Sequence, residues 1–131
     1  MENKIKHLEM IQGIINRMAS NSFLLKGWSI TLIVGIFALS AKDSNKQFFI
    51  VAYIPLIVFW FLDTFYLQLE RKYRNLYDKV RMLNEKNIDF SMKITEDLLN
   101  SKTNYVSCLF SISELVFYLP TVILVGIIGL I

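Results

Sequence analysis

Residues 50–59 read Ile-Val-Ala-Tyr-Ile-Pro-Leu-Ile-Val-Phe, and this stretch decides the fold class. The run does not alternate apolar and polar side chains, as a strand of a membrane β-barrel would. It belongs to a longer block, from Phe48 to Leu62, that contains no charged residue. An α-helix pairs every backbone polar group within itself, which the hydrocarbon of a bilayer requires. The stretch therefore predicts a membrane-spanning helix, in which Pro55 is tolerated.

Two further apolar blocks lie on either side of this one. The first carries a single charge, Lys26, and the last carries only Glu114. A helix crosses the hydrocarbon with about 20 apolar residues. The sequence therefore predicts an all-α membrane protein, a single membrane domain over residues 1–131 with transmembrane helices at 23–41, 48–67 and 105–131.

The composition of the chain agrees with this class. Of its 131 residues, 54% are hydrophobic and only 19% are charged. A soluble domain of this size seldom carries so much apolar surface, because the surface cannot all be buried. The apolar residues are also concentrated in blocks with the charges between them, which favours a bilayer as the environment.

Lysine and arginine are unevenly distributed between the blocks. Four precede or begin the first block, eight lie between the second and the third, and two lie in the short turn Lys42–Gln47. Basic residues that flank membrane helices stay in the cytoplasm. We therefore expect a multi-pass protein with its N-terminus and residues 68–104 in the cytoplasm and its C-terminus outside.

The N-terminal segment, residues 1–20, predicts an amphipathic helix. Apolar side chains recur there every three or four positions, at Ile5, Leu8, Ile11, Ile15 and Met18. Such a helix lies on the membrane surface or packs on neighbouring subunits. Alternatively, it acts as a gate or plug at the cytoplasmic mouth of a pore.

Residues 68–104 predict a cytoplasmic helical extension of the second span. Apolar residues repeat there with the 3.5-residue period of a coiled-coil seam, at Leu69, Tyr73, Leu76, Val80 and Leu83. This seam predicts packing on the N-terminal helix or on a symmetry mate. A break is expected at 84–90 and a short helix at about 91–101.

The extension is also basic, and five of its residues form a candidate site for an anionic ligand. A cluster of this kind binds nucleotides or short nucleic acids. The alternative is that it determines topology and attracts anionic lipid. The candidate residues are Arg71, Lys72, Arg74, Lys79 and Arg81.

Three charged residues within the blocks lie at one depth. Lys26, Asp63 and Glu114 are 15 to 17 residues from the outer ends of their blocks, which places all three about 22–26 Å from the outer surface. Charges in this layer are costly, and they are usually paired or turned toward water. The sequence leaves two alternatives open. Either Lys26 pairs with a carboxylate of its own subunit, or the carboxylates form a ring along an ion pathway.

Small residues recur at four-residue spacing on two of the predicted spans. Gly27, Thr31 and Gly35 follow this spacing in the first block, and Ser107 and Ser111 follow it in the last. Such stripes let membrane helices approach closely. Because three spans cannot enclose a wide aqueous path, we expect a homo-oligomer, with a tetramer as the expected form.

No set of residues for catalysis or metal binding is apparent. His7 is the only histidine and Cys108 the only cysteine, and they are a hundred residues apart. The chain has no glycine-rich phosphate loop. We therefore expect neither an enzyme nor a bound cofactor or metal.

Two stretches carry a resemblance to a known family. Residues 16–28 read Asn-Arg-Met-Ala-Ser-Asn-Ser-Phe-Leu-Leu-Lys-Gly-Trp, and residues 63–71 read Asp-Thr-Phe-Tyr-Leu-Gln-Leu-Glu-Arg. They resemble small bacterial membrane proteins of anti-phage defence islands, in particular the channel effectors of the Hailong system. The resemblance implies an oligomeric channel of the bacterial inner (plasma) membrane. It also implies control by the product of a nucleotidyltransferase, such as a nucleotide or a short DNA oligomer.

These observations predict a homo-oligomeric pore that collapses the membrane potential during phage infection (abortive infection). The alternative is a non-conducting anchor that recruits a soluble partner through residues 1–20 and 68–104. A third hypothesis is an accessory subunit of a larger transporter.

Overall fold

The computed structural model describes residues 2–43 and 47–130, with the side chains of all of these except 40–43 and 47–49. Within the described residues the protein is helical and contains no β-strand. Its helices are α1 (Glu2–Asp43), α2 (Gln47–Arg81), the short α3 (Tyr105–Leu109) and α4 (Ile112–Leu130). Three of them, α1, α2 and α4, are long and apolar enough to cross a membrane. The prediction of an all-α protein with three candidate membrane-spanning helices is therefore confirmed.

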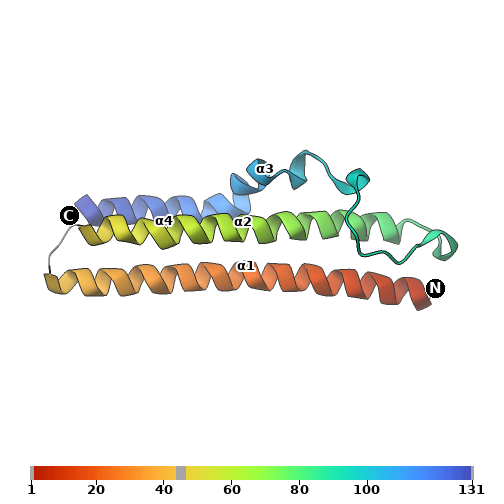
Figure 1. Cartoon of the computed structure of the whole chain (residues 1–131), viewed down its shortest axis with the longest axis horizontal. Helices are drawn as coiled ribbons and strands as arrows, with labels where there is room; N and C mark the ends of the chain where they lie inside the picture. The colour runs from red at the N-terminus through yellow and green to blue at the C-terminus, as the bar shows by residue number, and fades with distance from the viewer. Residues whose placement is uncertain (1, 44–46, 131) are drawn as a thin grey trace.

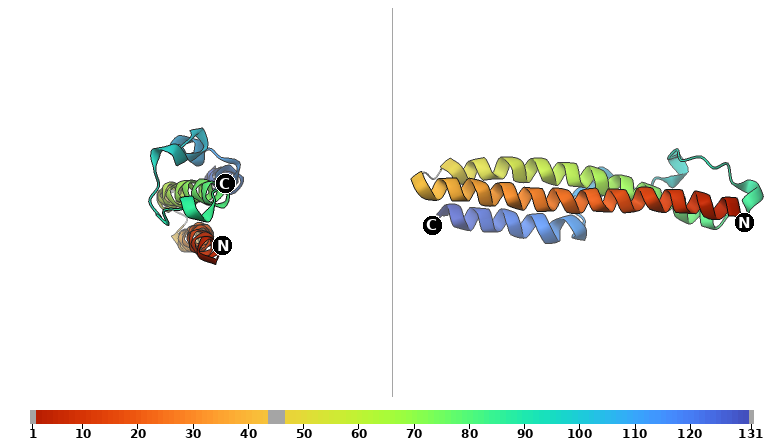
Figure 2. Two further views of the ribbon diagram at one scale, coloured as in Figure 1. Left: turned by 90° about the vertical axis from the view of Figure 1, so that its right-hand side faces the viewer. Right: turned by 90° about the horizontal axis from the view of Figure 1, so that it is seen from below.

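Helices α1 and α2 form a long antiparallel hairpin, and α4 lies along one half of α2 (Figures 1 and 2). We call this half, with residues 20–39, 50–67 and α4, the three-helix section. The other half, with residues 2–19 and 68–81 and the link 82–104, is the stalk. The N-terminus lies at the far end of the stalk, opposite the C-terminal end of α4 (Figure 1). The predicted turn Lys42–Gln47 includes residues 44–46, which lie outside the described residues.

Helix α1 runs without a break from the stalk into the three-helix section. The sequence separated an amphipathic helix at 1–20 from a span at 23–41, and the structure does not have this boundary. A helix that lies on the membrane surface would have to bend away from its span. Helix α1 instead continues along α2 to the end of the stalk (Figure 2).

The stalk has a hydrophobic core of its own. Ile11 and Ile15 of α1 pack against Leu76 and Val80 of α2, and all four side chains are buried. Ile88 and Leu98 of the link, also buried, complete this core. The seam on α2 therefore packs on the N-terminal segment of the same chain, which is the first of the two arrangements that its period predicted.

The link contains no α-helix between residues 91 and 101, so that prediction was wrong. The segment is extended and has short 3-10 turns at Glu96–Leu98 and Ser101–Thr103. Side chains of α2 hold it in this path: Asn75 donates a hydrogen bond to the carbonyl of Leu98 at 2.8 Å, and Gln68 donates one to Thr103 at 2.9 Å. These carbonyls are satisfied from α2, so the segment does not need helical bonds of its own.

The predicted span at 105–131 is also not one helix. It breaks at Phe110 and Ser111 into α3 and α4. The indole N–H of Trp60 donates to the carbonyl of Leu109 at 3.1 Å, which satisfies a group freed by the break. Helix α4 alone keeps the length needed to cross the hydrocarbon.

The core of the three-helix section joins all three long helices. Ile33 of α1, Leu56 of α2 and Tyr118 and Val125 of α4 are buried within it, together with Ala52. The ring of Tyr118 stacks on Trp60, with centroids 5.7 Å apart. This packing sets the rotation of α4 about its axis, and therefore the direction in which its one charged residue points.

Candidate functional site

The structure brings together the three charged residues that the sequence placed at one depth. Lys26 of α1, Asp63 of α2 and Glu114 of α4 meet inside the three-helix section. The Lys26 Nζ lies 2.5 Å from Asp63 Oδ2 and 3.9 Å from Glu114 Oε1. The intrasubunit pair, one of the two alternatives that the sequence left open, is therefore present in the single chain.

Two uncharged side chains complete this site. The Ser22 hydroxyl donates to Asp63 Oδ1 and accepts a hydrogen bond from Lys26 Nζ at 2.9 Å. The Tyr118 hydroxyl donates to Asp63 Oδ2 at 3.0 Å, and Lys26 Nζ lies 5.8 Å from the centre of the Tyr118 ring. We call these five residues (Ser22, Lys26, Asp63, Glu114 and Tyr118) the charge cluster.

Sequence reasoning missed Ser22 and Tyr118, although helical spacing could have found them. Ser22 precedes Lys26 by four residues on α1, and Tyr118 follows Glu114 by four on α4. Residues four apart in a helix share a face. A polar residue one turn from an intramembrane charge is therefore a natural candidate for the same site.

Burial and charge are not balanced across the charge cluster. Asp63 and Glu114 are 0% and 1% exposed, whereas Lys26 is 20% exposed. Asp63 accepts three hydrogen bonds, but neither oxygen of Glu114 has a hydrogen-bond partner. Two carboxyl groups thus share one ammonium group. Because a buried charge without a close partner is costly, Asp63 is the well-paired carboxyl group of the cluster and Glu114 is the poorly paired one.

The five basic candidates on α2 do not form a single site. Four of them are engaged within the chain. Arg71 donates to the carbonyl of Lys102 at 2.9 Å, and the others form ion pairs, Arg74 with Glu70, Lys79 with Asp97 and Arg81 with Asp78. The hydrogen bond from Lys79 holds the pKa of Asp97 below its ordinary value. Lys72 is half-buried.

A groove of about 420 Å³ does run along the basic side of α2. It is lined by Arg71 and Arg74, and also by Lys102, which the sequence analysis did not include. Asp78 lines it as well, so the groove is basic but not purely so. An anionic ligand would meet three cationic side chains there.

The small residues of α1 lie on a face that none of the described residues covers. Gly27, Thr31 and Gly35 are exposed, and a side chain built at either glycine would meet no atom within 4 Å. Ser107 and Ser111, by contrast, do not form a stripe, because the break before α4 separates them. The close-packing face predicted on α1 is therefore free for another helix, and the one predicted on the last span is interrupted.

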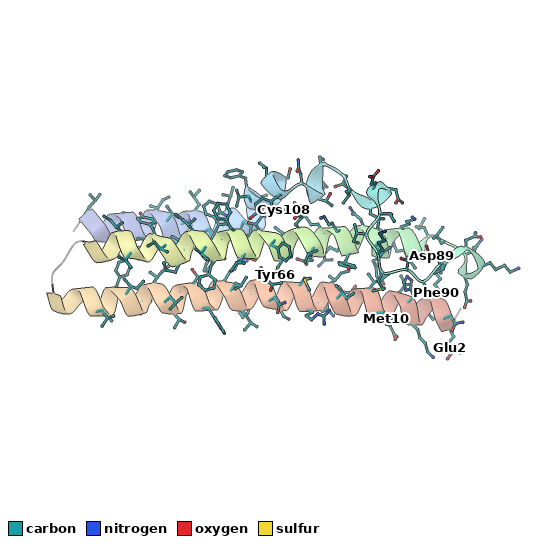
Figure 3. All side chains as sticks on the ribbon, in the orientation of Figure 1. Glu2, Met10, Tyr66, Asp89, Phe90 and Cys108 are labelled. Atoms are coloured by element: carbon teal, nitrogen blue, oxygen red, sulfur yellow. The ribbon has the colours of Figure 1, made fainter. Side chains whose placement is uncertain are left out.

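The end of the stalk holds a contact that the sequence did not predict. His7 is 2% exposed, and its ring lies 5.4 Å from that of Phe90. Phe90 has a positive φ of 57°, in the left-handed region that a bulky residue rarely adopts. Figure 3 shows Phe90 and Asp89 beside the N-terminal part of α1, near Met10 and Glu2. The link is thus folded back onto α1.

Within the described residues, no three His, Cys, Asp or Glu side chains gather as they would around a metal ion. Comparison with known proteins gives no relative: no protein-family model matches the chain, and no curated protein or solved structure is significantly similar to it. The resemblance to the Hailong effectors therefore stays a prediction.

Proposed function

We propose that the protein is a homo-oligomeric cation channel of the bacterial plasma membrane. The observation that carries this proposal is the charge cluster, in which two buried carboxyl groups share one ammonium group inside apolar helices. Ionisable residues within membrane-spanning helices are rare, and they mark substrate and ion pathways in many membrane proteins. Carboxylates along a pathway favour cations over anions.

The described arrangement is the closed state under this proposal. Asp63 and Glu114 face the interior of the three-helix section, so they line no open path. Glu114 lies in the first turn of α4, directly after the break at Phe110 and Ser111. A movement of α4 about this break would expose Glu114 while α1 and α2 stay joined through the stalk core, which contains no residue of α4.

Topology follows from the basic residues of the stalk. Residues 68–81 alone carry Arg71, Lys72, Arg74, Lys79 and Arg81. Under the positive-inside rule the stalk is cytoplasmic, and it extends about 20 Å beyond the bilayer surface. The C-terminal end of α4 then faces outward. The N-terminal segment acts as part of this cytoplasmic hairpin.

Oligomerisation uses the uncovered face of α1. Gly27, Thr31 and Gly35 let a helix of a neighbouring subunit approach the backbone closely. A tetramer remains the expected form, because several copies are needed to enclose a path that three helices cannot. The open pore would lie at the centre of these copies.

The channel is proposed to act as an effector of anti-phage defence that collapses the membrane potential. Its signal would be an anionic nucleotide or short DNA oligomer made by a nucleotidyltransferase. The basic groove of Arg71, Arg74 and Lys102 supports an anionic ligand on the stalk. The three cationic side chains outnumber the one carboxylate, Asp78, that lines the same groove, which favours a ligand with several phosphate groups.

Recording from purified protein in planar bilayers tests the proposal. We expect cation-selective current, either in the protein alone or after nucleotides or short DNA oligomers are added or removed. A protein that reconstitutes as an oligomer and never conducts under any of these conditions would contradict the proposal. Reconstitution is checked by the mass of the oligomer in nanodiscs.

A non-conducting membrane anchor is the second candidate, and one observation favours it. Lys26 already pairs with Asp63 within the chain, and four of the five basic candidates are engaged within the stalk. A stalk whose charged side chains are already paired would present a fixed surface to a soluble partner. A membrane-potential dye separates the two, because an anchor overproduced with any signal enzyme leaves the potential intact.

A further inference from the structure

The ammonium group of Lys26 occupies a position built like a cation-binding site. Its nitrogen contacts the hydroxyl oxygen of Ser22 at 2.9 Å and Asp63 Oδ2 at 2.5 Å, and Glu114 Oε1 lies 3.9 Å away. The face of the Tyr118 ring lies on another side, 5.8 Å from the nitrogen. Hard oxygen ligands and an aromatic face are the groups that bind monovalent cations in proteins.

Asp63 and Glu114 at this position are buried, whereas its occupant, Lys26, is partly exposed. Asp63 is held by the hydroxyl groups of Ser22 and Tyr118 and is fully buried. Lys26 is 20% exposed and sits on a flexible four-carbon stem. A lysine near the end of a span can reach the membrane interface with its ammonium group. Departure of Lys26 would leave two carboxyl groups, the Ser22 hydroxyl and the Tyr118 ring around an empty position.

Glu114 gives independent evidence that the position binds a cation. It is 1% exposed, points at Lys26 and makes no hydrogen bond with either oxygen. A carboxyl group that served only to hold the fold would be hydrogen-bonded at this burial. The position of Glu114 is explained if this residue helps to coordinate a metal cation, which could approach it more closely than the ammonium group of Lys26 does.

We propose that Ser22, Asp63, Glu114 and Tyr118 form a binding site for a monovalent metal cation such as K⁺ or Na⁺, and that Lys26 is a tethered competitor that fills it. That this competition closes a channel rests on the proposed function, in which the site is part of the ion pathway. In the closed state the ammonium group holds the site. In the open state Lys26 moves toward the cytoplasmic interface and metal cations replace it.

The test replaces Lys26 and asks whether a metal ion takes its place. Full-length wild type and Lys26→Gln are purified in detergent micelles, and thermal unfolding is followed in choline chloride and in KCl or NaCl of equal ionic strength. The Lys26→Gln variant should gain about 4 °C at saturating K⁺ or Na⁺, with a saturable dependence on concentration. The wild type should show no such gain. The double variant K26Q/E114Q should lose the response.

Equal melting temperatures of Lys26→Gln in choline and in both metal salts would overturn the proposal. So would stabilisation by acid alone, which would make the missing ligand a proton. If Lys26→Gln cannot be recovered in choline, purification in KCl replaces the melting measurement: recovery there supports the site, and aggregation in every salt overturns it.

The same variants separate this inference from the proposed function. Metal-dependent stability of Lys26→Gln without any current in bilayers would retain the cation site and reject the channel. Current through Lys26→Gln without metal-dependent stability would retain the channel and reject the tethered competitor.

Discussion

The stalk and the three-helix section both have a hydrophobic core, but their charged residues are arranged in opposite ways. In the stalk, acidic and basic side chains pair one to one on the surface, as in Lys79 with Asp97 and Arg74 with Glu70. In the three-helix section, two carboxyl groups share one ammonium group inside the protein. Exposed pairs contribute little to stability, whereas ionisable groups buried between membrane-spanning helices are costly and often mark functional sites.

The difference indicates where function lies in each half. The stalk carries its ion pairs and its basic groove on the outside, so its function is expected on its surface. The three-helix section carries its function inside, where a change of one charge alters both stability and electrostatics. The following substitutions test this contrast, beginning with the largest expected effect.

Asp63→Asn should destabilise the protein most. The substitution removes the charge that pairs with Lys26 at 2.5 Å and leaves the ammonium group beside a neutral amide. Loss of one partner of a buried pair costs about 3 kcal/mol, measured by thermal or denaturant unfolding in micelles. The control is Glu70→Gln, which breaks the pair with Arg74 in the stalk. Equal effects of the two substitutions would remove the contrast.

Ile11→Ala should come next, because it opens a cavity in the stalk core. Ile11 is 0% exposed and packs with Leu76 and Val80. Truncation of a buried isoleucine costs about 2–3 kcal/mol. Met10→Ala, at a position 60% exposed, serves as the control and should be close to neutral. If both substitutions are neutral, the stalk is not packed as described.

Glu114→Gln should act in the opposite direction and more weakly. Glu114 makes no hydrogen bond, so the amide loses little and the surplus of carboxyl groups disappears. We expect the melting temperature to stay unchanged or to rise, by about 1 kcal/mol of stability at most. A large loss of stability, similar to that of Asp63→Asn, would show that Glu114 is a structural residue.

The pair of Lys79 and Asp97 should have the smallest effect, and acid should remove it. Because the folded protein lowers the pKa of Asp97, the pair stabilises the link above the ordinary value of 3.8, and this contribution is lost as the pH falls through the lowered pKa. Asp97→Asn should therefore speed amide hydrogen exchange in residues 92–98 at neutral pH and have no effect well below pH 3.8. Exchange that responds equally at both pH values would contradict this pairing.

The sequence predicted what depends on position along a helix axis. Block length placed the three apolar helices, and depth alone brought Lys26, Asp63 and Glu114 to one level. Depth does not give rotation about the axis, so Ser22 and Tyr118 were not found until the packing of Trp60 on Tyr118 fixed the face of α4. The 3.5-residue period did identify the apolar seam of α2, because this period specifies which residues lie on one face of a helix.

Segments governed by contacts from elsewhere in the chain could not be predicted in this way. Residues 91–101 are extended because Asn75, far away in sequence, binds the carbonyl of Leu98. The break before α4 falls in an apolar run with no glycine or proline at the break itself, and Trp60 stabilises it from α2. The helix propensity of a segment depends on its own residues, so it contains no contribution from Asn75 or Trp60.

The reversal potential in a KCl gradient, measured for purified wild type and Glu114→Gln in planar bilayers, tests the central claim most directly. The claim is that the buried carboxyl groups form an ion pathway. The wild type should reverse near the equilibrium potential of K⁺, and Glu114→Gln should shift the reversal toward zero. Identical reversal potentials for wild type, Glu114→Gln and Asp63→Asn, or no current from any of them with or without nucleotides and short DNA oligomers, would contradict the account.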